Sequence, residues 1–304
     1  MIVKFFNFVE IKTKITSTLT FLLTMAFVVH QKYEINWDKT ILFFLGMLFF
    51  DLTTTAINNY IDSKDNGQIL PFERKKARNI IYVLFLVSMM LGLYLAYLTD
   101  LIILLTGVLC FIAGVLYTYG PIPISRMPLG EIASGFFYGL IIPFIILYMN
   151  APGGTYISYS LSMQTISLSL QVIPILILFL FSVTPFAVTA NIMLANNICD
   201  LEKDISVKRY TLPYYIGKMA LPLFAGFYYL TYISMISMVI LKILSPVALI
   251  SLITLIPVQK NIATFYKKQD KATTFNLSIL NFIIIMVVNS ISIVLSIILN
   301  NIGN

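Results

Sequence analysis

Nine long apolar runs constrain the fold of this chain more than any other feature of its sequence. Each run is close to the 17–25 residues that an α-helix needs to cross a bilayer. The runs lie near residues 15–30, 39–61, 79–99, 101–119, 130–149, 171–197, 213–241, 243–258 and 274–300. They do not alternate in polarity as the strands of a membrane β-barrel do. We therefore predict an all-α, polytopic membrane protein, a single domain over 1–304 with nine transmembrane helices around a central cavity.

The composition supports this reading and excludes several site types. Hydrophobic residues make up 59% of the chain and charged residues 11%, whereas soluble domains carry roughly 25% charged residues. Cys110 and Cys199 lie in or beside apolar runs and predict neither a disulfide framework nor a zinc site. His30 ends the first run, where we interpret it as an interfacial polar residue. That run has no clear small-residue cleavage site, so we do not expect a cleaved signal peptide.

The distribution of positive charge predicts the orientation in the membrane. When the loops are assigned alternately to two sides, 17 of the 20 Lys and Arg residues fall on one side. The other side holds Lys32, Lys39 and Lys242. Cytoplasmic loops carry the excess of positive charge. We therefore expect a protein of the cell membrane with a cytoplasmic N-terminus and an external C-terminus.

Two matching polar clusters stand at the cytoplasmic ends of the second and sixth runs. The segments are TTTAINNYIDSKDNG and TANIMLANNICDLEKD. Each contains Asn-Asn-x-x-Asp followed by a further acidic residue: Asn58, Asn59, Asp62 and Asp65 in the first, and Asn196, Asn197, Asp200 and Asp204 in the second. Their equivalent positions in the predicted topology indicate a weak internal repeat.

The spacing and chemistry of these clusters favour a site for Mg²⁺ and a diphosphate. Residues four apart share a helix face, which places Asn58 with Asp62, and Asn196 with Asp200 and Asp204. Mg²⁺ prefers oxygen ligands and completes its shell with water and phosphate oxygens. The basic residues nearby can pair with the remaining phosphate charge. The plainer alternative is that Asp and Asn simply end and cap these helices.

Three stretches resemble the UbiA superfamily of intramembrane prenyltransferases, and most closely its menaquinone branch, the 1,4-dihydroxy-2-naphthoate polyprenyltransferases. They are INNYIDSKDNG, YTYGPIPISRMPLGEIASGFFYG and LANNICDLEKDISVKRYTLPYYIG, and the resemblance extends from about residue 12 to 220. It implies Mg²⁺-dependent transfer of a polyprenyl group from its diphosphate to an aromatic acceptor. The expected partners are these two substrates and the lipid bilayer, with no nucleic acid. Three positions depart from the family pattern: Asn59 and Asn66 replace Asp, and Cys199 replaces Arg.

The resemblance also implies roles for individual residues. The expected metal ligands are Asn58, Asp62, Asp65, Asn196, Asp200 and Asp204. Of these, Asp62, Asp200 and Asp204 are expected to act in catalysis as metal-holding groups. Tyr117 and Tyr119 are expected to face an allylic carbocation, because aromatic faces attract cations. Expected substrate contacts are Asn58, Asn59, Asn196, Asn197, Arg126, Lys208, Arg209, Lys12 and Glu131.

Three alternatives stay open at the level of sequence. Intramembrane Asp and Asn side chains could coordinate a translocated cation in a transporter, although transporter sites lie near the bilayer midplane and these clusters lie at helix ends. A prenyltransferase could use a different acceptor, such as a hydroxybenzoate, homogentisate or a glycerol lipid. The altered first motif could also belong to a degenerate relative. For Glu131, a favourable position at a helix N-terminus is an equally good explanation.

Overall fold

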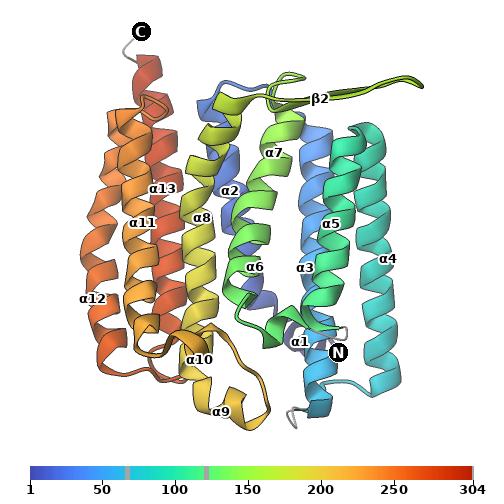
Figure 1. Cartoon of the computed structure of the whole chain (residues 1–304), viewed down its shortest axis with the longest axis vertical. Coiled ribbons are helices and arrows are strands. Elements are labelled where there is room, and N and C mark those ends of the chain that lie inside the picture. The colour runs from blue at the N-terminus through green and yellow to red at the C-terminus, as the bar shows by residue number, and fades with distance from the viewer. Residues whose placement is uncertain (66–68, 120–122, 303–304) are drawn as a thin grey trace.

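The chain forms a bundle of long helices that run side by side, with the two termini at opposite ends of the bundle (Figure 1). The structure is a computed structural model and describes residues 1–65, 69–119 and 123–302. Among these residues, eight helices are long and apolar enough to cross a membrane, and a shorter apolar helix, Leu101–Tyr117, brings the total to nine. The prediction of an all-α membrane protein is confirmed.

The helices follow the predicted runs closely. In chain order they are α1 (Ile2–Phe8), α2 (Ile15–His30), α3 (Trp37–Asp65), α4 (Arg74–Leu98), α5 (Leu101–Thr118), α6 (Gly130–Phe136), α7 (Ile142–Asn150), α8 (Val172–Cys199), α9 (Leu201–Ser206), α10 (Leu212–Ile216), α11 (Ala220–Ile240), α12 (Leu255–Lys267) and α13 (Asn276–Ile302). A π-helical stretch, Phe137–Ile141, joins α6 to α7 within one membrane span. Short 3-10 segments cover Ile11–Lys14, Ile124–Arg126, Gly217–Met219 and Pro246–Thr254.

The eighth span is longer than the apolar run predicts. The run ends at residue 258, but the span continues from Pro246 through α12 to Lys267. Its last part is amphipathic: Val258, Ile262 and Phe265 are buried, while Lys260 is exposed. The charged residues end the apolar run without ending the helix, because a helix needs only one apolar face to pack.

Two short strands interrupt the helical architecture. β1 (Ile157–Leu161) and β2 (Ile166–Leu170) form an antiparallel hairpin between α7 and α8. The hairpin lies at the end of the bundle opposite α9 and α10, and it extends sideways across the helix ends (Figure 1). The sequence analysis did not predict it.

Close packing of the α6–α7 span on α8 fixes the centre of the bundle. A Cβ atom added to Gly139, in the π-helical stretch, would lie only 2.2 Å from the backbone N and Cα of Phe186. One turn earlier, a Cβ on Gly135 would lie 2.9 Å from the ring of Phe186. Small residues four apart let two membrane helices approach this closely. The contact holds the first turn of α6 beside the last turns of α8, where the polar clusters lie.

The main apolar core lies between α2, α7, α8, α11 and α13 and includes a stacked pair, Phe27 on α2 and Phe181 on α8, with ring centres 4.2 Å apart. A second, smaller core packs α1 against α3 and α4 around Phe8, Leu52 and Ile81. The first core fixes α8, and the second fixes the end of α3. Both helices that carry the polar clusters are therefore held in place by apolar packing.

Candidate active site

A cavity of about 320 Å³ opens among α3, α4, α5 and the α6–α7 span. Apolar side chains such as Leu42, Phe43 and Ile145 line much of it. Asn58 and Tyr117 line it near the ends of α3 and α5, on the side of the bundle where the polar clusters stand. The cavity can therefore hold an apolar chain whose polar head lies beside these clusters.

The first cluster separates into two faces of α3. Asn58 lines the cavity, and Asp62 follows one turn later on the same face. Asn59 turns to the other side and donates hydrogen bonds to the Phe8 carbonyl at 3.0 Å and to Glu10 Oε1 at 3.1 Å. Asn59 therefore ties the N-terminal segment to α3. The side chain of Asp65 and all of Asn66 lie outside the described residues.

The second cluster is held together by a lysine from the far end of the chain. Lys271, between α12 and α13, donates a hydrogen bond to Asp200 Oδ2 at 2.7 Å and another to Asn196 Oδ1. Its ammonium group also lies 4.6 Å from the ring centre of Phe275. Asn196 and Asp200 thus share one face, as their spacing predicts. In the sequence analysis Lys271 was only one of the 17 positive charges counted on the side predicted to be cytoplasmic.

Asp204 lies in α9, just beyond this pair. The α-helical bond pattern continues across the junction, because Asp204 N donates to the Asp200 carbonyl at 2.8 Å. The Asp204 carboxylate is buried, and its Oδ2 has no hydrogen-bond partner among the described residues. Arg209 Nε lies 3.8 Å from that oxygen. Burial raises the pKa of the Asp204 carboxyl above its ordinary value of 3.8, while the Arg209 guanidinium opposes the shift.

Glu131 and Asn197 form a buried polar pair between α6 and α8. Asn197 Nδ2 donates to Glu131 Oε1 at 2.8 Å, and both side chains are at most 1% exposed. The second oxygen of Glu131 and the amide oxygen of Asn197 have no partner in the described part of the chain. Glu131 lies in the first turn of α6. It is therefore both a carboxylate at a helix N-terminus and a neighbour of the second cluster, so the two explanations are compatible.

Tyr117 connects the two clusters. Its hydroxyl group interacts electrostatically with Asp62 of the first cluster, with Glu131 on α6 and with Arg209. Arg209 in turn interacts with Asp204, and Asp204 with Asp200. Tyr117 also lines the cavity together with Asn58 of α3, and its hydroxyl group lies 3.9 Å from Met193 Sδ on α8. It therefore lies between the helices that carry the two clusters.

Four other predicted residues lie toward the surface. Tyr119 follows α5 and is 66% exposed, whereas Tyr117 faces the cavity. Lys12 and Lys208 are also exposed. The side chain of Arg126 is exposed, and its carbonyl accepts a hydrogen bond from Tyr210 N at 3.3 Å. Arg209 Nε donates to the Ser125 carbonyl at 2.9 Å, which holds the 209–210 segment against the loop that carries Arg126.

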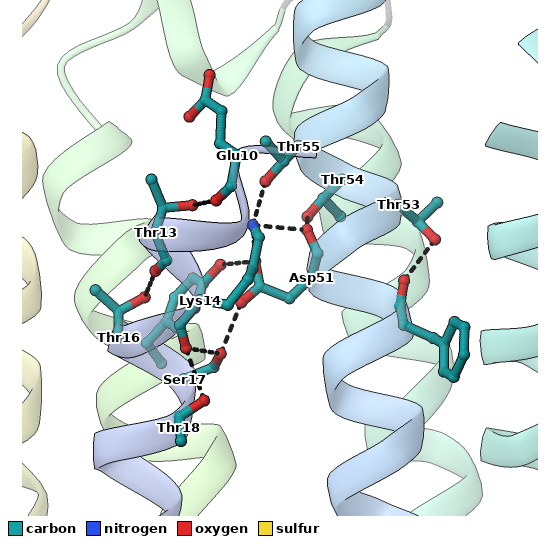
Figure 2. Close-up of polar contacts among 12 residues, drawn as sticks. Glu10, Thr13, Lys14, Thr16, Ser17, Thr18, Asp51, Thr53, Thr54 and Thr55 are labelled. Carbon is teal, nitrogen blue, oxygen red and sulfur yellow. Dashed lines mark hydrogen bonds and ion pairs between the residues drawn. The ribbon is translucent and has the colours of Figure 1, made fainter. Parts of the chain in front are cut away.

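A buried ion pair joins Lys14 to Asp51 (Figure 2), and Asp51 lines the cavity two helical turns before Asn58 on α3. Lys14 Nζ donates to Asp51 Oδ1 at 2.7 Å, to the Asp51 carbonyl at 3.1 Å and to Thr55 Oγ1 at 2.5 Å. Asp51 also accepts hydrogen bonds from Ser17 and from Tyr138, at 2.7 and 2.8 Å. Lys14 and Asp51 are both about 5% exposed. Every donor of the ammonium group is used, which a buried charge requires.

The oxygen groups at the mouth fit a Mg²⁺ ion that shares its ligands with a phosphate. They are carboxylates and amides, and three buried oxygens, on Glu131, Asn197 and Asp204, lack hydrogen-bond partners among the described residues. Those residues contain no group of three or more His, Cys, Asp or Glu side chains placed to hold a metal by themselves. Mg²⁺ commonly takes one or two carboxylates and completes its shell with water and substrate phosphate. In this structure Lys271 neutralises part of that oxygen-rich surface.

The family model of the UbiA prenyltransferase family matches residues 18–296, nearly the whole chain. The chain belongs to the UbiA prenyltransferase family. The family predicted from the sequence motifs is therefore confirmed. A curated relative, 1,4-dihydroxy-2-naphthoate octaprenyltransferase of Bacillus subtilis (strain 168), is 28% identical over 227 residues. This match covers 69% of the chain and 66% of the relative, just under two thirds of the relative's length.

Solved structures of UbiA homologues share the fold. An apo UbiA homologue from Aeropyrum pernix K1 has a TM-score of 0.67 at 16% identity, covering 92% of this chain and 98% of that one. A UbiA homologue from Archaeoglobus fulgidus bound to GPP and Mg²⁺ has a TM-score of 0.63 at 15% identity, covering 96% and 99%. At these identities the similarity establishes the arrangement of helices, and the roles of individual residues come from this chain's own geometry.

Proposed function

We propose that this UbiA-family chain transfers a polyprenyl group from polyprenyl diphosphate to an aromatic acceptor, 1,4-dihydroxy-2-naphthoate, in menaquinone biosynthesis. One observation carries the proposal: Asn58 of the first cluster, Tyr117 on α5 and Met193 on α8, one turn before the second cluster, line the same end of an apolar cavity. This arrangement suits a substrate with a long apolar tail and a doubly charged head. The match to the naphthoate octaprenyltransferase supports the choice of acceptor.

The two clusters are proposed to bind the diphosphate head through Mg²⁺. The metal ligands would come from Asn58 and Asp62 on one side and from Asn196, Asp200 and Asp204 on the other. Bound Mg²⁺ supplies positive charge that stabilises the departing diphosphate. Arg209, already beside Asp204, adds a fixed donor to the same charge, with Arg126 and Lys208 on the neighbouring loops. Donors fixed in advance at a developing charge contribute much of the rate enhancement in such sites.

The cavity is proposed to protect the reacting carbon. When the C–O bond breaks, the diphosphate keeps the electron pair and the allylic carbon becomes electron-poor. Tyr117 lines the cavity beside the clusters, and its aromatic face can stabilise that positive charge. The apolar wall excludes water that would otherwise capture the cation. A carbon of the acceptor ring then supplies the electron pair of the new C–C bond. The ring regains its aromaticity by releasing the group on that carbon, as CO₂ if it carries the carboxylate or as a proton if it carries hydrogen.

The proposed orientation follows the charge distribution. Asn58 and Tyr117 place one end of the cavity at the end of the bundle that carries α1 and α9 (Figure 1). The loops assigned to that side in the sequence carry most of the lysines and arginines. The positive-inside rule places this end in the cytoplasm of a cell membrane and the C-terminus outside. Both the diphosphate and the acceptor would then reach the site from the cytoplasm.

The function is tested with the purified protein in lipid nanodiscs. With Mg²⁺, a polyprenyl diphosphate and 1,4-dihydroxy-2-naphthoate, we expect release of pyrophosphate and formation of a prenylated naphthoquinol. Asp200→Ala should abolish both, because it removes a carboxylate from the second cluster. The matched control is Glu202→Ala, an exposed carboxylate two residues away, which should keep full activity. Equal activity of the Asp200→Ala protein would contradict the mechanism.

The acceptor is tested separately. The same protein is given 4-hydroxybenzoate, homogentisate or the naphthoate at equal concentrations, and the prenylated products are separated by mass. We expect the naphthoate to be the preferred acceptor. Prenylation of another acceptor at a higher rate would leave the prenyltransferase mechanism in place and exclude the naphthoate assignment. A transporter would release no pyrophosphate with any of them.

A further inference from the structure

The hairpin between α7 and α8 is sharply amphipathic. The strands pair in the register Ile157 with Leu170, Tyr159 with Leu168, and Leu161 with Ile166. Paired residues and residues two apart in a strand share one face of a hairpin, so these six apolar side chains lie on one side. The other side carries only serines: Ser158, Ser160, Ser167 and Ser169. Residues 157–170 contain no charged side chain.

Contacts at the base of the hairpin show which way the apolar face points. The Tyr159 hydroxyl accepts a hydrogen bond from the backbone N–H of Leu101, the first residue of α5, at 3.3 Å. Ile157, on the same face, packs against the main apolar core. The apolar face is therefore the one directed toward the helices. The serine face is directed away from them, and there Ser160 and Ser167 are hydrogen-bonded across the strands at 2.7 Å.

The outer half of the apolar face has no protein beneath it. Leu161, Ile166 and Leu168 are 57%, 80% and 61% exposed. The hairpin projects beyond the outline of the bundle, across the helix ends rather than along them (Figure 1). A two-stranded hairpin with one apolar face bare is at best marginally stable in water. Its amphipathic pattern therefore needs an apolar surface next to the helix ends.

We propose that the apolar face of the 157–170 hairpin lies on the surface of the lipid bilayer, at the end of the bundle opposite the candidate active site. α7 ends at Asn150 and α8 begins at Val172, so the hairpin leaves and re-enters the bundle where the membrane spans end. The helices there face lipid: Val172 and Ile173, directly after the hairpin, are 66% and 72% exposed. The hairpin's apolar face is continuous with that surface.

Lipid explains the hairpin better than a partner protein does. Exposed apolar residues continue from Leu168 and Leu170 on β2 to Val172 and Ile173 in the first turn of α8, with Gln171 between the two elements. An amphipathic element at an interface buries its apolar face among the acyl chains and keeps its polar face in water. Serine hydroxyl groups suit the water side, and the uncharged strands carry no feature that would select a charged partner.

Two neighbouring residues on opposite faces give a matched experiment. Cys110 and Cys199 are first replaced by Ala, because they are the only cysteines of the chain. Single cysteines are then introduced by Leu168→Cys and by Ser167→Cys, and each is labelled with an environment-sensitive fluorophore in liposomes. Nitroxide groups on the lipid acyl chains should quench the label at position 168 several-fold more than the label at 167. Aqueous iodide should show the opposite preference.

Other outcomes overturn the proposal in distinguishable ways. If iodide quenches both labels equally, the hairpin stands clear of the membrane. If the label at 168 is shielded from iodide but lipid nitroxides do not quench it, a protein surface covers the apolar face instead. The same two labels are also measured in protein from which lipid and detergent have been removed and which is kept in solution by an amphipathic polymer. The fluorescence of each label in that sample is its reference value. None of these readouts depends on whether the chain transfers a prenyl group.

Discussion

The ammonium group of Lys271 lies 2.7 Å from Oδ2 of Asp200, and it also donates a hydrogen bond to Asn196. These are two of the oxygens to which Mg²⁺ is proposed to bind. A lysine is thus already present where a metal ion would bring positive charge. Binding of Mg²⁺ must displace this ammonium group or share the oxygens with it.

The first prediction follows from that competition. Lys271→Met should bind Mg²⁺ more tightly in the absence of diphosphate, because the competing cation is gone. The gain should be at most about fivefold, since a half-exposed ion pair contributes no more than about 1 kcal/mol. The affinity is measured by titrating each protein with Mg²⁺ and recording its thermal unfolding temperature, which rises as the ion binds the folded state. Lys268→Met is the control, because Lys268 pairs with Asp270 at 3.5 Å. Weaker Mg²⁺ binding in Lys271→Met would show that the lysine supports the metal.

The second prediction concerns Asp204 and pH. Burial raises the pKa of its carboxyl above 3.8, so the folded state favours the protonated form. Its contribution to stability is complete below about pH 3.8 and is lost as the pH rises through the raised value. Asp204→Asn stays neutral throughout. We expect the variant to gain stability over the wild type between pH 4 and pH 7.5 while it loses prenyl transfer.

Unfolding temperatures at several pH values, in one detergent, test this sign. Glu202→Gln is the matched control, because Glu202 lies on the same short helix and is exposed; it should show no such pH-dependent gain. If the wild type instead becomes more stable than Asp204→Asn as the pH rises, the ionised carboxylate has good partners within the fold. The proposal that its unpartnered oxygen binds Mg²⁺ would then be wrong.

The third prediction concerns the ion pair in the cavity wall. Asp51→Leu leaves the Lys14 ammonium buried without its counter-charge, which should cost about 3–5 kcal/mol of unfolding free energy. The double variant Lys14→Met, Asp51→Leu should recover most of that loss. The measurement is a double-mutant cycle on reversible unfolding in mixed micelles. Thr53→Val is the control, because Thr53 bonds only the Phe49 carbonyl on another face of α3 (Figure 2). Additive losses in the cycle would contradict a coupled pair.

The fourth prediction concerns the contact between the π-helical stretch and α8. Gly139→Ala places a methyl group 2.2 Å from backbone atoms of Phe186, and a backbone cannot rotate out of the way. We expect the free energy of unfolding to fall by about 1–3 kcal/mol, the usual effect of overpacking. The rate of prenyl transfer should also fall, because α6 and α8 move apart. Gly226→Ala on α11 is the control, since its added methyl meets nothing within 4 Å. Unchanged unfolding of Gly139→Ala would show that the helices separate freely.

The membrane spans could be predicted because hydropathy is a local property of the chain. The shared face of the polar residues near the ends of α3 and α8 was also predictable, since residues four apart lie on the same side of a helix. The same rule could have separated Tyr117 from Tyr119, because residues two apart do not share a helix face; in the structure Tyr119 lies just beyond the end of α5. It also separates Asn58 from its neighbour Asn59, which bonds the Phe8 carbonyl instead.

The pairings across the bundle could not be predicted in this way. Lys14 with Asp51, and Lys271 with Asp200, join residues 37 and 71 positions apart, and no local spacing encodes which helices become neighbours. The hairpin did leave a signal, because ISYSL and ISLSL alternate with a period of two. The alternating pattern is short and lies between two long apolar runs, so the sequence alone does not distinguish it from a loop.

The Lys14–Asp51 pair also bears on how the protein is made. Lys14 belongs to the first span and Asp51 to the second, so the ribosome synthesises the cation well before its counter-charge. Lys14 lies in the 3-10 segment at the start of the first span, where a lone lysine costs less than the roughly 3 kcal/mol it costs at the centre of a membrane helix, but it has no counter-charge until α3 is made. The first span is therefore expected to wait at the translocon and enter the bilayer together with the second, as one helical hairpin.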